Sequence, residues 1–388
     1  MSITSGNSEH LPGNKTKYYQ AHNIRVLTPL QAIQMRPAMY LGDVGRRGLH
    51  QLLEIVLLRI MAKHLFDEGR VEISLLEDNS IVVTDNLPEV IEEDELGQMD
   101  FAPDLNDYKR VMQSYGLSLA VVNALSSFLE ISTYVEEQVY AQRFEEGIVD
   151  IAIRQIEDKN LKGTKIHFKP AETCFVEIIF DFQYIAARLW ELACFNKGAS
   201  FCLQDQRDLN HHGESKYQVF QTEKGILDFI PTLHNGSDWL LSNAFVLDQV
   251  DIKIAFNYNT SCVENVKSYV NNTLTSWGGT HLTGFRRALT YSLKSFARIK
   301  GIAKAKQLTG TDFKKGLVAI ISINLTNARF DGASKVKLWS PEVVSLVYTT
   351  LSQALRLFWE SNPSQTAAII YKAISDQNNP LIKNNDQI

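Results

Sequence analysis

The sequence predicts an α+β protein with two domains, and three patterns support this. Apolar residues recur at steps of three and four over residues 48–66, which predicts a long amphipathic helix. The segments 71–76 and 80–85 alternate between apolar and polar residues, so they are expected to pair as a β-hairpin. Residues 317–325 form a nearly continuous apolar run, which is typical of a strand covered on both faces.

The rest of the first half is read from the same signals. Residues 36–42 are expected to form a loop that leads into the long helix, because Pro and Gly punctuate this segment. A helix followed by a strand is expected over residues 180–203. Further strands are expected at three segments, 129–135, 139–145 and 163–171.

The second half begins with strands expected at 250–261 and 266–272. Two glycines then release the chain into a helix over residues 280–299. A last helix is expected to begin with Ser340 as N-cap and Pro341 at the first helical position, and to run to Trp359.

The composition limits the functional classes. The chain has 388 residues, 45% hydrophobic content and a net charge of −5, so two cores can form and any nucleic-acid contact must be local. The four cysteines are too scattered for metal or redox spacing, which indicates free thiols in a reducing compartment. The first fifteen residues lack a signal-peptide pattern, and no apolar run is long enough to span a membrane. We therefore expect a cytoplasmic protein.

Four stretches carry a resemblance to a known family. Residues 23–50, 260–272, 278–290 and 330–343 resemble, in the same order, stretches of the B subunits of the bacterial type II topoisomerases, DNA gyrase and topoisomerase IV. The resemblance covers residues 19–375. It implies a two-layer α/β sandwich of the GHKL (Bergerat) ATPase type, followed by a transducer domain of the ribosomal S5 domain 2-like type. The implied segments are an N-terminal arm, an ATPase-like domain, a transducer domain and a polar tail, at 1–22, 23–213, 214–376 and 377–388.

In that family the long helix carries the pattern E-x-x-D-N-x-x-D, which supplies a general base, a supporting Asp and a magnesium-binding Asn. Counting forward from Gly48 places Ile55, Leu58, Arg59 and Ala62 on this stripe, and none of them is an acid or an amide. Counting backward from the following strands would put Glu54 at the base position instead. The first register keeps the apolar face in phase, and neither register provides the Asn.

The resemblance also implies remnants of a nucleotide site. Asp85 stands where the family has the adenine-binding Asp, although an Asp at a strand end is also a common turn cap. Thr164 stands where a hydroxyl supports that Asp. Residues 107–128 align with the phosphate loop, of whose four glycines Gly116 alone is kept, with Lys109 at a lysine position.

Three further features follow from the resemblance. Lys335 occupies the place of the transducer lysine that reaches the γ-phosphate, and Tyr19 that of the arm tyrosine that reaches the partner's nucleotide. His211 and His212 lack partners at ligand spacing, so no metal site is expected. In the family, residues of the transducer helix line the cavity through which DNA passes, although a basic stripe is also typical of a solvated helix. The candidate DNA contacts are Arg286, Arg287, Lys294 and Arg298.

These observations lead to one interpretation and two alternatives. We expect a gyrase-B-like module that has lost ATP hydrolysis, needs no cofactor, and regulates type II topoisomerase as a homodimer or as a heterodimer with a B subunit. The first alternative is the ATP-binding and ATP-hydrolysing half of a B subunit, with ATP and Mg²⁺, Glu54 as base and Arg59 replacing part of the metal's charge. The second is a sensor that binds an adenine-like ligand through Asp85 and Thr164 without phosphates.

Overall fold

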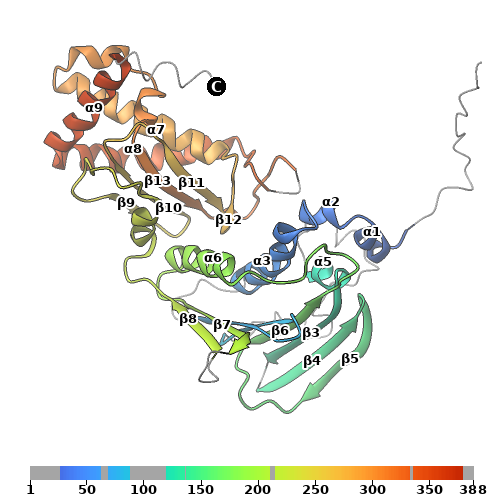
Figure 1. The fold of residues 1–388 in the computed structure, drawn as a ribbon. Coiled ribbons are helices and arrows are strands. Elements are labelled where there is room, and N and C mark those ends of the chain that lie inside the picture. The colour runs from blue at the N-terminus through green and yellow to red at the C-terminus, as the bar shows by residue number, and fades with distance from the viewer. Residues whose placement is uncertain are drawn as a thin grey trace, which may run out of the picture.

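The computed structural model describes residues 27–62, 69–87, 119–135, 137–209, 215–332 and 335–378, and these form two lobes (Figure 1). The first lobe is built on an eight-stranded sheet and the second on a five-stranded sheet. Helices pack against both sheets, so the predicted α+β class is confirmed. In the part of the chain described, no helix is long and apolar enough to cross a membrane.

The first sheet has the strand order β5-β4-β3-β6-β2-β1-β7-β8. Its neighbouring strands are antiparallel, except that β1 and β7 run parallel. The hairpin expected from the sequence is the pair β1 and β2. The strands are β1 (Arg70–Leu75), β2 (Ile81–Asp85), β3 (Ser126–Val135), β4 (Gln138–Glu145), β5 (Ile148–Ile156), β6 (Thr164–Pro170), β7 (Ser200–Leu209) and β8 (Ser215–Phe220).

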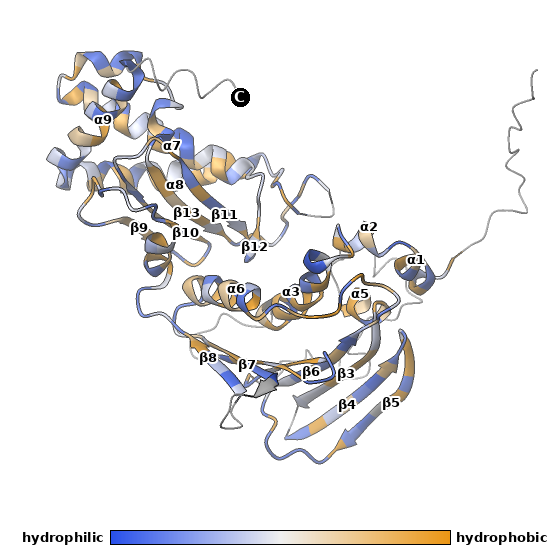
Figure 2. Cartoon of the chain, viewed as in Figure 1, coloured by the Kyte–Doolittle hydropathy of each residue, from blue (hydrophilic) through white to orange (hydrophobic). Residues whose placement is uncertain are grey.

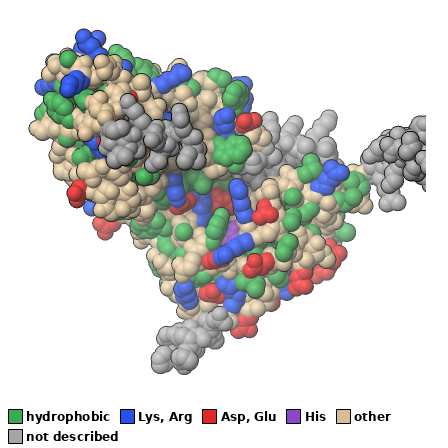
Figure 3. All heavy atoms as spheres, turned by 45° about the horizontal axis from the view of Figure 1, so that its top comes forward, with side chains coloured by type: hydrophobic (Ala, Val, Ile, Leu, Met, Phe, Trp, Pro, Cys, Tyr) green, Lys and Arg blue, Asp and Glu red, His purple; other side chains and the backbone are tan. Residues whose placement is uncertain are grey.

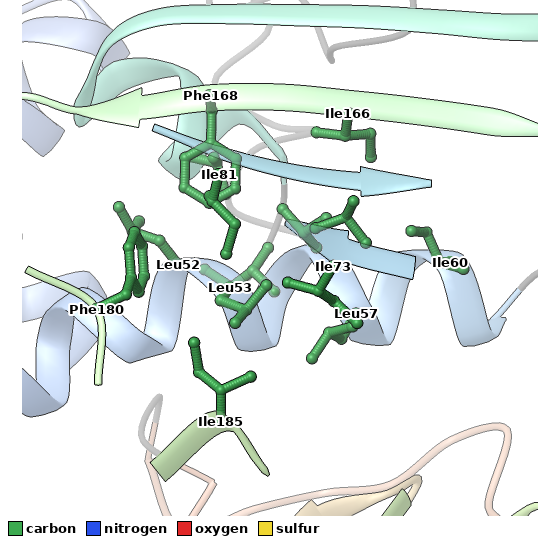
Figure 4. Packing of buried hydrophobic residues seen from close by; sticks show 14 of the residues in the cluster. Leu52, Leu53, Leu57, Ile60, Ile73, Ile81, Ile166, Phe168, Phe180 and Ile185 are labelled. Atoms are coloured by element: carbon green, nitrogen blue, oxygen red, sulfur yellow. The ribbon is translucent and has the colours of Figure 1, made fainter. Parts of the chain in front are cut away.

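Three helices cover one face of this sheet: α3 (Arg46–Ala62), α5 (Leu119–Ala124) and α6 (Phe182–Phe195) (Figure 1). Helix α3 is the long helix expected from the apolar periodicity, and Figure 2 shows hydrophobic residues along the helices and along the strands of this sheet. Its apolar side chains enter one core with side chains of the strands and of α6. Figure 4 shows this packing at Leu52, Leu53, Leu57, Ile73, Ile81, Phe168 and Ile185. Each such buried leucine stabilises the fold by about 1.5–3 kcal/mol.

The segment before α3 differs from the expected loop. Residues 36–42 contain a short helix, α2 (Pro37–Leu41), which follows α1 (Pro29–Met35). Pro37 stands at the start of α2, where its missing N–H would have no helical partner in any case. Gly42 ends the helix at a φ of 80°, a conformation that suits glycine. The two residues predicted to fix a loop therefore begin and end a helix.

The second sheet has the order β12-β11-β13-β10-β9, and β11 runs parallel to the central strand, β13. Every residue of β13 (Leu317–Ile323) is buried, as the apolar run predicted. Alternate residues of this strand enter two cores, because side chains of a strand alternate between its faces. The other strands are β9 (Phe245–Asp248), β10 (Ile252–Tyr258), β11 (Asn265–Val270) and β12 (Thr273–Leu274).

Helices α7 (Thr280–Ile299) and α8 (Glu342–Ser361) pack together on one face of the second sheet, with α9 (Pro363–Asn378) beside them (Figure 1). The other face is covered by the 3₁₀ helix η3 (Gly225–Leu233). Two more 3₁₀ helices follow α7, η4 (Ala303–Gln307) and η5 (Asp312–Lys314). Helix α7 has the predicted bounds.

The start of α8 corrects a prediction. Ser340 does not cap this helix, whose N-cap is Pro341, because the Ser340 hydroxyl accepts the Arg329 backbone N–H at 3.1 Å.

Strand β8 lies within the segment expected to be the transducer domain. It pairs with β7 at the edge of the first sheet. Most of its side chains are exposed on both faces, so its sequence has the polarity of a linker. The expected tail begins inside α9, because that helix runs to Asn378.

Candidate functional site

Three polar side chains lie side by side where strands β2, β6 and β3 meet. The register of β3 and β6 places Thr133 opposite Thr164, and their hydroxyl oxygens are 3.0 Å apart. Asp85 ends β2 beside them, because the residue before it, Thr84, pairs with Lys165. All three side chains are buried, with exposures of 4% or less. Of the three, Asp85 borders a cavity of about 320 Å³.

Gly163 brings the chain close to Asp85. A Cβ atom at this position would lie 2.2 Å from Asp85 Oδ1 and 2.5 Å from its carbonyl oxygen, so no other residue fits without movement. Asp85 Oδ1 also accepts the backbone N–H of Leu87 at 2.9 Å. The turn-cap reading of Asp85 is therefore confirmed, while its adenine contact stays a prediction.

The face of α3 that the favoured register assigns to catalysis has no carboxylate in the structure. Ile55, which this register predicts at the family's base position, is 2% exposed and belongs to the hydrophobic core. Arg59, predicted at the position of the metal-binding Asn, is exposed. A guanidinium carries no lone pair for a proton or a metal ion, so neither side chain can act as a base or a ligand.

Glu54 points in another direction. One residue along a helix turns the side chain by about 100°, so Glu54 projects away from the Ile55 stripe toward α6. There its two carboxylate oxygens accept from Arg188, at 2.9 Å from Nε and 2.5 Å from Nη2. Burial opposes the charge of Arg188, but Glu54 and Glu191 outweigh it, so the pKa of Arg188 is raised. Arg188 therefore stays charged throughout the ordinary pH range.

A cavity of about 480 Å³ lies between the two lobes, within the size range of small-molecule sites. Helices α3 and α6 form one wall, and β12 with the residues after it forms the other. Val336, which follows Lys335, also borders this cavity. Figure 3 shows Lys and Arg side chains gathered around this junction.

Lys335 lies in the loop before the cavity. Its side chain is half-buried, and its ammonium group lies 5.9 Å from the centre of the Phe330 ring. Burial lowers the pKa of Lys335. Three other predicted residues, Tyr19, Lys109 and Gly116, lie outside the described residues, as do the paired histidines.

The predicted DNA contacts divide into two kinds. Arg286 is held by Glu264, whose Oε1 accepts from Nε at 3.0 Å and from Nη2 at 2.8 Å, so it is engaged within its own domain. Arg287 and Arg298 are exposed. Lys294 donates to the Leu308 carbonyl at 2.9 Å. A second cavity, of about 660 Å³, is lined by Lys294, Arg298 and further residues of α7 and η4.

Two parts of the site escaped sequence reasoning. Thr133 was not singled out because its contact with Thr164 depends on the strand register. Arg188 was not singled out because its partners lie on other elements, although a charge pair three residues apart, with Glu191, was a readable signal. Among the described residues, no group of three His, Cys, Asp or Glu side chains could hold a metal ion.

The sequence of this chain is similar to those of known DNA gyrase B proteins. The family model DNA gyrase B matches residues 217–386. The chain is 36% identical to the DNA gyrase B protein of Cytophaga hutchinsonii over 277 residues, which are 70% of this chain and 58% of that protein. It is 32% identical to the DNA gyrase B protein of Chlamydia pneumoniae over 388 aligned positions, gaps included, which cover 92% of this chain and 48% of that protein. The chain thus spans about half the length of the curated relatives it matches.

Solved structures agree. The 43K ATPase domain of Thermus thermophilus gyrase B matches with a TM-score of 0.70 and 29% identity, covering 90% of this chain and 94% of that one. The topoisomerase IV ATP-binding domain of Francisella tularensis shares the fold, with a TM-score of 0.72, 23% identity and coverage of 90% and 97%.

The two lobes therefore define a GHKL-type ATPase fold joined to a transducer domain. Within this class, the chain is similar to the amino-terminal half of DNA gyrase B proteins, to two of which it is 36% and 32% identical.

Proposed function

We propose that this gyrase-B-type module has lost ATP hydrolysis and acts as a dimerising or partner-binding protein of type II topoisomerase. The observation that carries the proposal is the pair of neighbours on α3: the base position holds the buried Ile55, and the nearest carboxylate, Glu54, is bound by Arg188. A general base contributes on the order of 10²–10⁴ in rate, so its loss alone would reduce hydrolysis to a low level. The missing magnesium-binding Asn and phosphate-loop glycines of the sequence would weaken nucleotide binding as well.

The retained structure supports a binding role. Both sheets keep dense apolar cores, whereas the losses gather at one site. A chain that has lost ATP hydrolysis but kept its fold still presents the surfaces through which a partner protein can bind. The partner we propose is a second copy of this chain or a topoisomerase B subunit of the same cell.

Calorimetric titration with a non-hydrolysable ATP analogue, with and without Mg²⁺, tests the loss of activity. The Thermus thermophilus gyrase B ATPase domain serves as a matched positive control. We expect no heat from this chain and no ATP turnover. Magnesium-dependent binding together with hydrolysis that Glu54→Gln abolishes would replace the proposal with an active ATPase.

The partner role is tested separately. Sedimentation of the full chain and of a variant lacking residues 1–22 measures self-association, and we expect the shortened chain to dimerise more weakly. Co-purification from the native host tests pairing with a B subunit. A monomer that recovers no B subunit would contradict the partner role while leaving the loss of ATPase activity standing.

A second candidate function is supported by the buried row of Asp85, Thr133 and Thr164. These groups could bind an adenine-like base that carries no phosphates. Titration with adenosine tests this, with Asp85→Asn as the variant, because the amide keeps the shape and reverses part of the hydrogen-bonding pattern. Equal binding of adenosine to both proteins would exclude Asp85 as the contact.

A further inference from the structure

One buried charge cluster joins the two lobes. At its centre, Arg188 of α6 binds both carboxylate oxygens of Glu54 on α3. Its Nη1 donates to Glu191 Oε2 at 3.1 Å, and Nη2 also donates to the carbonyl oxygen of Asn272 at 2.5 Å. Glu191 Oε1 accepts in turn from Lys267 Nζ at 2.7 Å. We call these five residues the domain-coupling cluster.

The members come from both lobes. Glu54, Arg188 and Glu191 belong to the first, whereas Lys267 on β11 and Asn272 in the turn after it belong to the second. The cluster holds two positive and two negative side chains, so its charges balance. The side chains of Arg188, Glu54 and Glu191 are 13%, 16% and 14% exposed, which shields their attraction from water.

The turn that presents the Asn272 carbonyl is held in place. Asn271 and Asn272 have φ angles of 50° and 61°, in the left-handed region that Asn tolerates better than most residues. The Asn271 amide bonds both ways to Leu325, donating to its carbonyl at 2.8 Å and accepting its N–H at 2.7 Å. The Asn272 carbonyl that accepts from Arg188 therefore belongs to a turn whose conformation is fixed by hydrogen bonds.

The same interface contains an apolar part. Phe195 of α6 packs against Tyr269 of β11 and Phe229 of η3, with the Tyr269 ring centroid 4.6 Å away. Apolar contact attracts without a preferred direction, whereas a guanidinium has fixed donor directions. The apolar contacts can thus hold the two lobes together, and the charged groups can determine the relative orientation of the lobes.

We propose that Arg188 is a positioning residue, and that the domain-coupling cluster sets a single orientation of the second lobe against α3 and α6. This inference goes beyond the proposed function and does not depend on it. In any other orientation, Arg188 would lose the Asn272 carbonyl and Glu191 would lose Lys267. A buried charge that loses its partner is strongly destabilising, so intermediate orientations are poorly populated.

Spin-label distance measurements on the full chain test the proposal. One label is placed on the exposed Cys262 of the second lobe and one on Asn160→Cys of the first, with Cys174→Ser to prevent a third label. The variant is Arg188→Met, which keeps the length of the side chain. We expect one narrow distance distribution for the parent and a broadened or split distribution for the variant.

Arg207→Met is the matched control. Arg207 also donates to two carboxylate oxygens, those of Asp205, and to a backbone carbonyl, that of Phe180, each at 2.8 Å. These partners lie within the first lobe, so their loss should leave the distribution narrow. Equal broadening in both variants would show general loosening and would overturn the assignment to Arg188.

Two further variants keep the test decisive if Arg188→Met folds poorly. Lys267→Met removes a half-exposed member from the second lobe alone, and should broaden the distribution less. Adding Glu54→Gln to Arg188→Met removes one stranded carboxylate, so it should restore folding without restoring the narrow distribution. A narrow, parent-like distribution in either of these folded proteins would contradict the proposal.

Discussion

The buried His281 should make the stability of this protein fall in mild acid. This histidine follows Gly279 at the start of α7, is fully buried, and has Nε2 3.2 Å from the Thr275 hydroxyl. Burial lowers its pKa to about 4, from an ordinary value of 6.5. The folded protein therefore keeps this imidazole neutral over a pH range in which the unfolded chain protonates it.

This difference in pKa determines the direction and size of the change in the free energy of unfolding with pH. Above pH 6.5 both states hold the neutral imidazole, so His281 adds no pH dependence. As the pH falls from 6.5 toward 4, the unfolded chain binds a proton that the folded protein excludes, so the free energy of unfolding decreases. A full separation between these two pKa values corresponds to a loss of about 3 kcal/mol.

Urea unfolding of the parent and of His281→Gln across this pH range measures the effect. Carboxylates, the buried His50 and the half-buried His167 titrate in both proteins, so they cancel in the difference. We expect the parent to lose about 3 kcal/mol more than the variant between neutral pH and pH 4. Parallel profiles would refute the reasoning, because they would mean that His281 is protonated in the folded state or reached by water.

Three other predictions follow from single sites. Arg188→Met should lower the free energy of unfolding by about 3–5 kcal/mol in denaturant titrations, because it strands buried carboxylates, and a loss below about 1 kcal/mol would show that water compensates them. Gly163→Ala should lower the melting temperature by several degrees and displace Asp85, since its Cβ would meet that side chain; an unchanged melting temperature would contradict the close approach. The double variant Ile55→Glu, Arg59→Asn returns the family's base and metal ligand to α3, and we expect no ATP turnover, because the phosphate loop stays altered; measurable turnover would locate the defect in α3 alone.

The sequence predicted the elements whose pattern is strong and local. Helix α3, helix α7 and strand β13 were expected because their apolar spacing alone determines which face is buried. Strand β8 was missed, since it lies at a sheet edge with water on both faces and has no apolar alternation. Ser340 was expected to cap α8, but its hydroxyl accepts the N–H of Arg329, which is eleven residues away and which local pattern does not reveal.

The candidate site was predictable where it depends on position along one helix. The side chains of Glu54 and Ile55 point in directions that differ by about 100° around the axis of α3. The two registers and the direction of each side chain could therefore be predicted from the sequence. The structure adds where each direction leads, to Arg188 for Glu54 and to the core for Ile55. Partners such as Thr133 come from strand pairing over long separations, which local pattern does not determine.

Strand β13 has a consequence for how a disturbance would spread through this protein. Val318 and Ile320 point toward η3 and the first lobe, while Ala319 and Ile321 point toward α7 and α8. The two faces of this strand thus belong to two hydrophobic cores. Because protein interiors are densely packed, a shift of the strand would change the packing in both cores. A ligand that displaced α7 or α8 would therefore also change the packing around Phe195 and Tyr269, on the other face of β13.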